Sequence, residues 1–404
     1  MTPIRVVHLA TSLYGGAGIA ARRTHEALLS AGVDSKLFSL TGFRSEYKSA
    51  ETIERRKLNR FISSAVTFSQ AKFIQNSQRL VTTISIGNLK LDFLARKEFD
   101  VIHIHSFYNL LSIKQIKEFA RTFHDKKIFV TLHDERVLTG GCHYVGSCVQ
   151  NQNSCDNCPQ VRPLFRALVH KQFIQSTISF RGLGNLTLIA PSSWIALKAR
   201  MSRVTSDLNC VVVRNPVPNY FFEKHSSNSS ASKKQICFIS ANLNNELKGL
   251  DTLITSLNII KLEHPKLEFK VCFVGTGEAN GLDKEIEFDI ISTESDSQTA
   301  EVLRNTNLLV VPSLEDNLPS TMLEALAVGI PVVGARIGGI TEVLEKANQR
   351  LFEAGNATQL SKAILETLKE PHLVNKKEIE REYSYSTVAL ALLREYSGSS
   401  NSGH

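Results

Sequence analysis

The chain has 404 residues, of which 42% are hydrophobic, 21% are charged and 7% are aromatic. This composition excludes a disordered chain, a collagen-like repeat and a small disulfide framework, and the length excludes a single small binding module. Lys and Arg outnumber Asp and Glu by 47 to 39, which gives a formal net charge of +8 at pH 7. This surplus favours anionic partners such as phosphorylated lipids, nucleotides or nucleic acids.

The first half of the chain alternates buried strands with helices. Strands are expected at residues 4–9, 35–40, 100–105, 127–133 and 186–190, and a helix at 19–31. These strands are continuous apolar runs, which indicates a parallel sheet covered on both faces.

A second cycle of the same kind follows Asn215-Pro216 and a polar linker at residues 223–234. Its strands are expected at residues 235–240, 269–274, 286–291, 308–312 and 331–334, followed by a last helix at 379–396 and a disordered tail at 397–404. The fold class is therefore α/β with two halves of similar size.

Targeting and membrane signals are few. No apolar run reaches the roughly 18 residues that a spanning helix needs, and the first ten residues contain no signal-peptide core. Cys210, Cys237 and Cys272 lie in apolar runs, as reduced thiols of cytosolic proteins do. The segment 55–74 has apolar residues at near-helical spacing and four cations at one end, which fits a helix on an anionic membrane surface or, equally, a core-facing helix with a solvated basic end.

Two motifs of the first half follow predicted strands. Gly15, Gly16 and Gly18 stand between the first strand and the first helix, where glycines bring helix amides close to a phosphate or a sugar hydroxyl, although a plain turn is the alternative. His133 and Asp134 emerge at the end of an apolar strand, where ligands bind in doubly wound sheets, although the histidine could instead cap its own strand.

His105 is a second site candidate near a strand end, and His103 is expected to be a hydrogen-bonded core residue. In the second half, Lys248 beside Gly249 could place an ammonium on a diphosphate, and Gly275 with Gly277 forms another glycine turn at a strand end. Each of these signals is weak by itself.

The strongest motif is the segment 311–333. A strand ends near Pro312, an acidic loop leads into a helix, and Glu324 lies about one turn into that helix, where it can accept two ribose hydroxyls. Asp316 could face the sugar of the donor, and the amides of Gly338 and Gly339 could lie near its phosphates. The alternative is that these carboxylates are solvated charges at a helix start.

Taken together, these motifs resemble retaining glycosyltransferase family 4, which has the GT-B fold of two Rossmann-like domains with parallel sheets facing a central cleft. The resemblance implies an acceptor-side domain at 1–215, a nucleotide-sugar domain at 216–378 and a helix at 379–396 that returns to the first domain. It also implies transfer of a hexose-type sugar, with retention, from a nucleoside diphosphate sugar of the UDP or GDP type to a lipid-linked or growing oligosaccharide.

The resemblance assigns roles to the motif residues, and no cofactor is required for catalysis. Catalytic roles fall to His133, Asp316 and Lys248, and acceptor-side roles to His105 and Asp134. The donor-binding set is Gly15, Gly16, Gly18, Lys248, Gly249, Gly275, Gly277, Asp316, Asn317, Leu318, Glu324, Gly338 and Gly339.

Two features depart from the family pattern. Asp316 stands where the family has Glu, and no Arg precedes Lys248 to clamp the diphosphate; Arg336 or Arg214 could compensate. These departures keep a non-catalytic GT-B scaffold open as an alternative.

Four cysteines, Cys142, Cys148, Cys155 and Cys158, lie within an insert at 139–160. They supply the thiolates of a structural zinc site, but their spacing is not that of a standard zinc finger, so two local disulfides or free thiols are equal alternatives. The insert is similar to a cysteine-rich insert in a branch of the family that builds bacterial surface polysaccharides. We therefore expect a polysaccharide-biosynthesis enzyme in the cytoplasm, peripheral on the inner face of the membrane.

Other functions stay open. A GT-B epimerase or hydrolase would act on the nucleotide sugar without an acceptor. A zinc-dependent nucleic-acid binder would use the cysteines and the net charge, but basic and aromatic residues are not interleaved on one element, so no nucleic-acid partner is expected.

Overall fold

The computed structural model describes residues 4–40, 50–53, 57–76, 79–85, 87, 89–223 and 233–398. The chain divides into two compact units, Met1–Pro216 with Tyr385–His404, and Val217–Ser384. Parts of several expected segments lie outside the described residues: Arg55 and Arg56, residues 224–232 of the polar linker and residues 399–404 of the tail.

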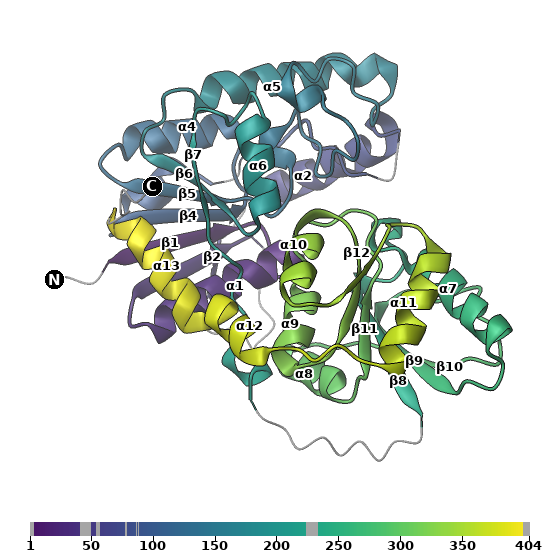
Figure 1. The fold of residues 1–404 in the computed structure, drawn as a ribbon. Coiled ribbons are helices and arrows are strands. Elements are labelled where there is room, and N and C mark those ends of the chain that lie inside the picture. The colour runs from purple at the N-terminus through teal and green to yellow at the C-terminus, as the bar shows by residue number, and fades with distance from the viewer. Residues whose placement is uncertain are drawn as a thin grey trace. The chain divides into compact units, whose positions relative to one another are not determined.

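The first unit contains a seven-stranded parallel sheet in the order β3-β2-β1-β4-β5-β6-β7 (Figure 1). Its strands are β1 (Arg5–Ala10), β2 (Asp34–Ser39), β3 (Ala50–Thr52), β4 (Val101–Ser106), β5 (Lys127–Thr131), β6 (Leu186–Ala190) and β7 (Asn209–Val212). The five strands expected from apolar runs are confirmed, and β3 and β7 are additional edge strands.

Helices cover both faces of this sheet, as the continuous apolar strands predict. They are α1 (Gly15–Ser30), α2 (Lys57–Ser69), α3 (Leu91–Ala95), α4 (Ile113–Thr122), α5 (Arg166–Phe180), α6 (Ser193–Met201) and α13 (Tyr385–Ser397), and a π-helical turn at Gln70–Ile74 follows α2. Leu9 and its neighbours pack with α4, α5 and α6. Val6, on the opposite face, packs with α1 and α13, so the end of the chain completes the first unit (Figure 1).

The second unit contains a six-stranded parallel sheet in the order β10-β9-β8-β11-β12-β13. Its strands are β8 (Lys234–Asn242), β9 (Phe269–Thr276), β10 (Glu287–Ile291), β11 (Leu308–Val311), β12 (Val332–Ala335) and β13 (Arg350–Phe352). Its helices are α7 (Leu250–Glu263), α8 (Asp296–Arg304), α9 (Ser320–Val328), α10 (Gly338–Lys346), α11 (Ala357–Lys369) and α12 (Lys376–Tyr383). One core cluster lies under α7 and α11 and another under α8, α9 and α12.

Two expected elements differ in the structure. The single helix expected at 379–396 is two helices, α12 and α13, because the backbone of Ser384 is extended, with ψ at 155°. The first helix begins at Gly15 instead of residue 19, so Gly15, Gly16 and Gly18 form its first turn and are not a loop in front of it.

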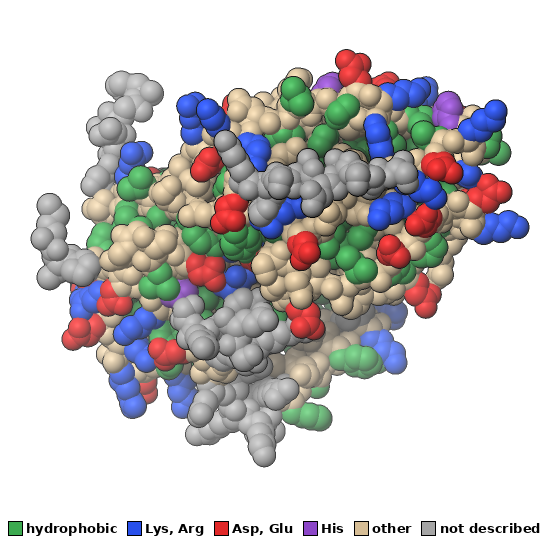
Figure 2. All heavy atoms as spheres, turned by 90° about the horizontal axis from the view of Figure 1, so that it is seen from below, with side chains coloured by type: hydrophobic (Ala, Val, Ile, Leu, Met, Phe, Trp, Pro, Cys, Tyr) green, Lys and Arg blue, Asp and Glu red, His purple; other side chains and the backbone are tan. Residues whose placement is uncertain are grey.

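The surface carries mixed charge. On the face in Figure 2, Lys and Arg side chains are interspersed with Asp and Glu side chains and do not form one basic stripe. Among the described residues, no helix combines the length and the hydrophobicity that crossing a membrane requires.

Candidate functional site

The second sheet has a topological switch point between β8 and β11. From β8 the chain adds β9 and β10 on one side, and then β11, β12 and β13 on the other. In open α/β sheets, ligands bind beyond the carboxyl ends of the strands at such a point. The predicted residues follow these strand ends: Lys248 and Gly249 after β8, Asp316, Asn317 and Leu318 after β11, and Gly338 and Gly339 after β12.

Lys248 and Asp316 form an ion pair across this switch point. Lys248 Nζ lies 2.6 Å from Asp316 Oδ2, and the lysine side chain is 30% exposed while the aspartate side chain is 9% exposed. The Leu314 amide donates to Leu247 O at 2.8 Å, which joins the same two loops through the backbone. The ammonium is therefore held at the edge of the sheet with one side open to solvent.

Glycines allow the loops around the pair to pack closely. Gly249 has φ at 74° and lies so close to Pro312 O that a Cβ would overlap it. Gly338 has φ at 51° and lies in the same way against Asp316 O. The Gly339 amide donates to Asn317 O at 2.7 Å, so it joins the two loops. The expected contact of Gly339 with a phosphate stays a prediction.

Glu324 lies in α9 directly after the Asp316 loop. It is 3% exposed, and Asn317 and Leu318 are buried as well. Gly329, with φ at 98°, ends the helix. The two carboxylates of the strongest sequence motif are thus both buried beside the switch point, where a ligand must enter the fold to reach them.

The glycine turn after β9 also packs against the loop that follows β8. A Cβ on Gly275 would overlap Ser240 O, and one on Gly277 would approach the side chain of Asn244. Both glycines therefore have a packing role.

The two arginines that could replace the missing clamp both have partners within the protein. The Arg336 guanidinium lies 2.7 Å from Glu345 and 3.3 Å from Glu353 on the surface. Arg214 Nη1 donates to Pro191 O at 3.0 Å in the first unit.

The first sheet has its own switch point between β1 and β4. The Thr11 amide donates to Ser106 O at 2.8 Å and joins the two strand ends. Gly15 and Gly16 are exposed at the start of α1, and the space beside the Cα of Gly16 is open. Gly18 is buried, and a Cβ there would overlap the backbone of Leu13. Only the first two glycines therefore lie where a ligand could approach.

Histidines form a hydrogen-bonded row from the interior of this sheet to its edge. His8 Nδ1 lies 3.0 Å from His105 Nε2, and His105 Nδ1 lies 3.4 Å from His133 Nε2. His8 and His105 are buried, and His133 is half-buried at the end of β5. His105, expected on the acceptor side, is thus a buried residue behind His133. His103 donates or accepts at Tyr396 Oη (2.6 Å) and Thr131 Oγ1 (2.7 Å), as expected for a core histidine.

These rings are neutral at physiological pH. Burial and the neighbouring His133 lower the pKa of His103 to about 3, and burial lowers the pKa of His133 to about 4, although Asp134 opposes the shift. Burial and the other rings lower the pKa values of His8 and His105 as well. Nitrogen atoms of His8, His103 and His105 lie within 4.8 Å of one another, but most are already paired in hydrogen bonds, so the row is a hydrogen-bonded cluster.

Asp134 is held by residues that the sequence did not single out. His143 Nδ1 lies 2.7 Å from Asp134 Oδ2, and the Arg136 amide donates to Asp134 Oδ1 at 2.9 Å. Burial would raise the pKa of Asp134, but His143 and the Arg136 amide lower it below its ordinary value. His143 directly follows Cys142, and only this position in the cysteine-rich insert could have signalled its role.

Two further charged groups lie nearby. The Arg136 guanidinium stacks over Phe107 and Tyr108, with ring-centroid distances of 4.7 and 5.1 Å, and burial lowers its pKa to about 10. Glu135, which is 2% exposed, pairs with Lys198 and accepts a hydrogen bond from the Val145 amide at 2.6 Å. Sequence spacing gave no signal for the pairing with Lys198.

The match to a known protein family lies in the second unit. Residues 233–370 match the family described as "Glycosyl transferases group 1". An uncharacterized glycosyltransferase of Methanocaldococcus jannaschii is 27% identical over 165 residues, which are 37% of this chain and 44% of that protein. A protein of Escherichia coli assigned to colanic acid biosynthesis as the glycosyl transferase WcaC is 22% identical over 278 residues, or 64% of this chain and 65% of that protein. The chain thus spans less than two thirds of the length of each relative.

Solved structures match the whole chain. Sucrose-phosphate synthase from Thermosynechococcus elongatus has a TM-score of 0.66 at 16% identity, with 98% of both chains covered. HepE from Anabaena, in complex with UDP and glucose, has a TM-score of 0.63 at 13% identity, with 98% of this chain and 99% of that chain covered. The chain therefore has two Rossmann-like domains as in GT-B glycosyltransferases, and its second unit is similar in sequence to the group 1 glycosyltransferases.

Proposed function

We propose that the protein is a glycosyltransferase that moves a sugar from a nucleoside diphosphate sugar to a lipid-linked or growing oligosaccharide in surface-polysaccharide biosynthesis. One observation carries the proposal: the Lys248–Asp316 ion pair lies at the switch point of the sheet, within the segment that matches the group 1 family. The half-exposed ammonium is suited to a diphosphate, and the buried carboxylates of Asp316 and Glu324 are suited to hydroxyl groups.

In this reaction the bond between the anomeric carbon and the diphosphate oxygen breaks, and a bond to the acceptor oxygen forms. Lys248 would stabilise the charge that develops on the departing diphosphate. Asp316 would bind a hydroxyl of the transferred sugar, and Glu324 would bind the ribose. Binding of a diphosphate by Lys248 would also compete with its ion pair, so donor binding would release the carboxylate of Asp316 for the sugar.

The first unit would bind the acceptor and position the reacting sugar. His133 is neutral at pH 7 and can donate or accept a hydrogen bond. We assign retention of anomeric configuration on the resemblance to family 4. In that case the leaving phosphate takes the acceptor proton on the same face, and no protein nucleophile is needed.

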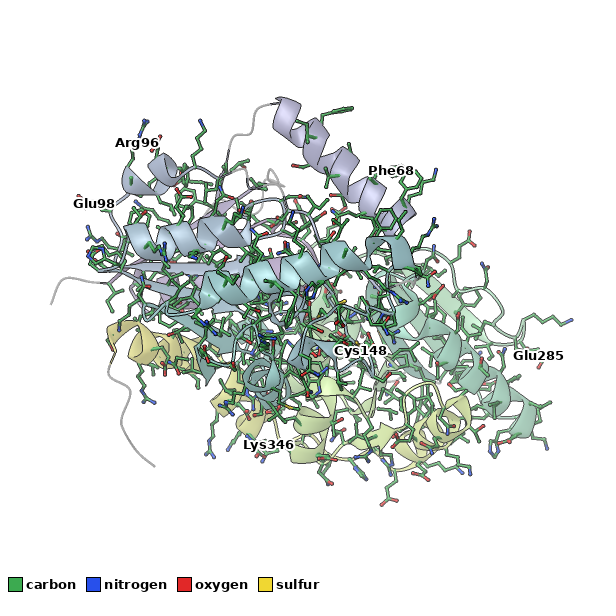
Figure 3. The ribbon with its side chains drawn as sticks, turned by 90° about the horizontal axis from the view of Figure 1, so that it is seen from above. Phe68, Arg96, Glu98, Cys148, Glu285 and Lys346 are labelled. Atoms are coloured by element: carbon green, nitrogen blue, oxygen red, sulfur yellow. The ribbon has the colours of Figure 1, made fainter. Side chains whose placement is uncertain are left out.

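We further propose that α2 places the enzyme on an anionic membrane, where a lipid-linked acceptor resides. Phe61, Phe68 and Phe73 are 73%, 63% and 50% exposed, and Phe68 is labelled on α2 in Figure 3. Lys72 Nζ lies within 6 Å of the Phe68 and Phe73 ring centroids, at 5.6 and 5.7 Å. Aromatic rings beside a cation are suited to the interface of an anionic bilayer.

Donor binding is tested by thermal unfolding in the presence of UDP, GDP and ADP sugars. We expect one nucleotide class to raise the Tm, because a ligand that binds only the folded state stabilises it. The cognate sugar nucleotide is then incubated with and without candidate acceptors. No Tm shift with any nucleotide would contradict the proposal, and sugar release or epimerisation without an acceptor would indicate a hydrolase or an epimerase.

Membrane binding is tested by sedimentation with vesicles that contain anionic phosphatidylglycerol. The double variant Phe61→Ser, Phe68→Ser should bind less, whereas Leu262→Ser should bind like the parent, because Leu262 is 83% exposed on α7 of the other unit. Equal binding of both variants would exclude this role of α2.

A further inference from the structure

The segment 139–162 buries thiols although it contains little regular structure. Its regular part is one 3₁₀ turn, Gln150–Gln152. Cys142, Cys155 and Cys158 are 6%, 5% and 3% exposed and belong to the main core cluster, and Cys148 packs against the same cluster (Cys148 is labelled in Figure 3). This long irregular segment thus buries three thiols and partly buries a fourth, and a bound ion would hold such a segment together.

Cys142 and Cys158 already stand at the spacing of two ligands of one ion. Their sulfur atoms lie 3.9 Å apart. A tetrahedral zinc ion with bonds of about 2.3 Å to sulfur places two ligand sulfurs about 3.8 Å apart. A disulfide would require about 2.05 Å, so the pair is not bonded.

Backbone amides are directed at two of the sulfur atoms. The amides of Gln160 and Val161 donate to Cys158, and the Gly140 amide donates to Cys155. Hydrogen bonds of this kind are typical of the groups surrounding metal ligands.

We propose that Cys142, Cys148, Cys155 and Cys158 bind one structural zinc ion. Four sulfur ligands fill a tetrahedral ion and leave no open position for catalysis, and a tetrahedral set of thiolates is typical of zinc. Of these four described sulfurs, Cys142 and Cys158 stand at ligand spacing. No three of the four lie within 4.8 Å of one another, so the proposal requires Cys148 and Cys155 to move toward the pair when the ion binds.

The site would fix the residues that follow β5. His143, the neighbour of Cys142, is hydrogen-bonded to Asp134, and the Glu135 amide donates to His143 O at 2.9 Å. The insert is thus tied directly to the His133–Asp134 end of the strand. The proposal that the zinc site shapes the acceptor-binding side of the first unit rests on the proposed function. The proposal that the cysteines bind zinc does not.

The test is metal analysis of the full chain purified without a chelator. We expect about one zinc ion per chain by mass spectrometry of the metals, and four thiols that react with a thiol reagent in denaturant only after the zinc is removed. The double variant Cys148→Ser, Cys155→Ser should lose the zinc. Cys210→Ser should keep it, because Cys210 lies on β7 outside the insert and is also only partly buried.

The parent protein decides the question if the double variant does not fold. A parent chain that holds less than about one tenth of an equivalent of zinc after growth in zinc-containing medium, and that does not bind added zinc, would overturn the proposal. Cysteines that do not react until a reductant is added would overturn it too, because they would be in disulfides. Zinc content does not depend on activity, so an inactive protein with zinc would contradict only the proposed function.

Discussion

Lys248 Nζ lies 2.6 Å from Asp316 Oδ2, and this contact joins the loops that follow the two central strands of the second sheet. The pair keeps a cation and a carboxylate at the switch point before any ligand binds. Since a diphosphate offers the ammonium more negative charge than one carboxylate does, the ion pair is suited to be exchanged when the donor binds. Substitutions in this pair therefore test the proposed function most directly.

Lys248→Ala should lower kcat/KM by about 100-fold, because the charge on the leaving diphosphate loses its cation. The effect should fall mainly on kcat and is measured with a saturating nucleotide sugar. Lys261→Ala is the matched control: Lys261 also forms an ion pair in the second unit, at 3.2 Å from Glu285, which is labelled in Figure 3. Normal turnover of Lys248→Ala would remove the lysine from the catalytic machinery.

Glu324→Gln should weaken nucleotide-sugar binding by about 10-fold while kcat changes less, because hydrogen bonds to a charged group contribute about 1.5–3 kcal/mol. Calorimetry should show a similar loss for the nucleotide without the sugar, since the ribose is common to both. Glu366→Gln, in the exposed pair with Arg350, is the control. A loss confined to the sugar nucleotide would instead place Glu324 on the sugar.

The arrangement of the buried strands could be predicted because they are continuous apolar runs. The additional strands β3, β7 and β13 have three or four residues each and lie at or near sheet edges, where little burial is needed, so their sequences carry a weak signal. The helix expected to continue to Tyr396 breaks at Ser384, where neither Gly nor Pro marks the end.

For the site, the rule that ligands bind beyond the carboxyl ends of parallel strands predicted which residues lie near one another. It did not predict which of these residues form ion pairs or hydrogen bonds. Lys248 and Asp316 are 68 residues apart, and their contact follows from the placement of β11 beside β8, which no single motif encodes. The same holds for His8. A polar residue within an apolar strand indicates that its side chain has a hydrogen-bond partner, but the partner, His105, is determined by the pairing of β1 with β4.

Stability should fall on acidification because the histidine row is buried in the neutral form. The unfolded state takes up protons near the ordinary pKa of 6.5, whereas His133 and His103 in the folded state do so near pKa values of about 4 and about 3. Between these values the unfolded state binds more protons, so the free energy of unfolding falls as the pH falls, by about 1.4 kcal/mol per pH unit for each such histidine.

Urea unfolding between about pH 7 and about pH 5 measures this slope. His103→Phe keeps a ring but removes one titrating group, and it should lower the average slope over this range by about 1 kcal/mol per pH unit. A free energy of unfolding that stays constant over this range would show that the histidines take up protons in the folded protein over the same pH range as in the unfolded protein.

The same row should fix the tautomer of His133. His8 Nε2 has no hydrogen-bond partner among the described residues, and a buried N–H without an acceptor is rarer than a bare acceptor nitrogen. The proton of His8 therefore belongs on Nδ1 and points to His105 Nε2, which places the proton of His105 on Nδ1 and that of His133 on Nδ1. Nitrogen NMR of the rings should show this form, and His8→Phe should mix the tautomers of His133 whereas His103→Phe should not.

Substitution of Gly16 tests whether a ligand approaches the first unit, because we expect the change to affect activity without lowering thermal stability. The space beside its Cα is open and its φ is not in the left-handed region, so Gly16→Ala should leave the Tm unchanged or raise it slightly through helix propensity. The added methyl group would stand over the exposed start of α1 and, where a phosphate or sugar approaches those amides, should lower kcat/KM by about 10-fold. Gly18→Ala, whose Cβ overlaps the Leu13 backbone, should lower the Tm instead. A Gly16→Ala variant with both Tm and kcat/KM unchanged would mean that the start of α1 does not contact the substrates, and donor recognition would then rest on the second unit.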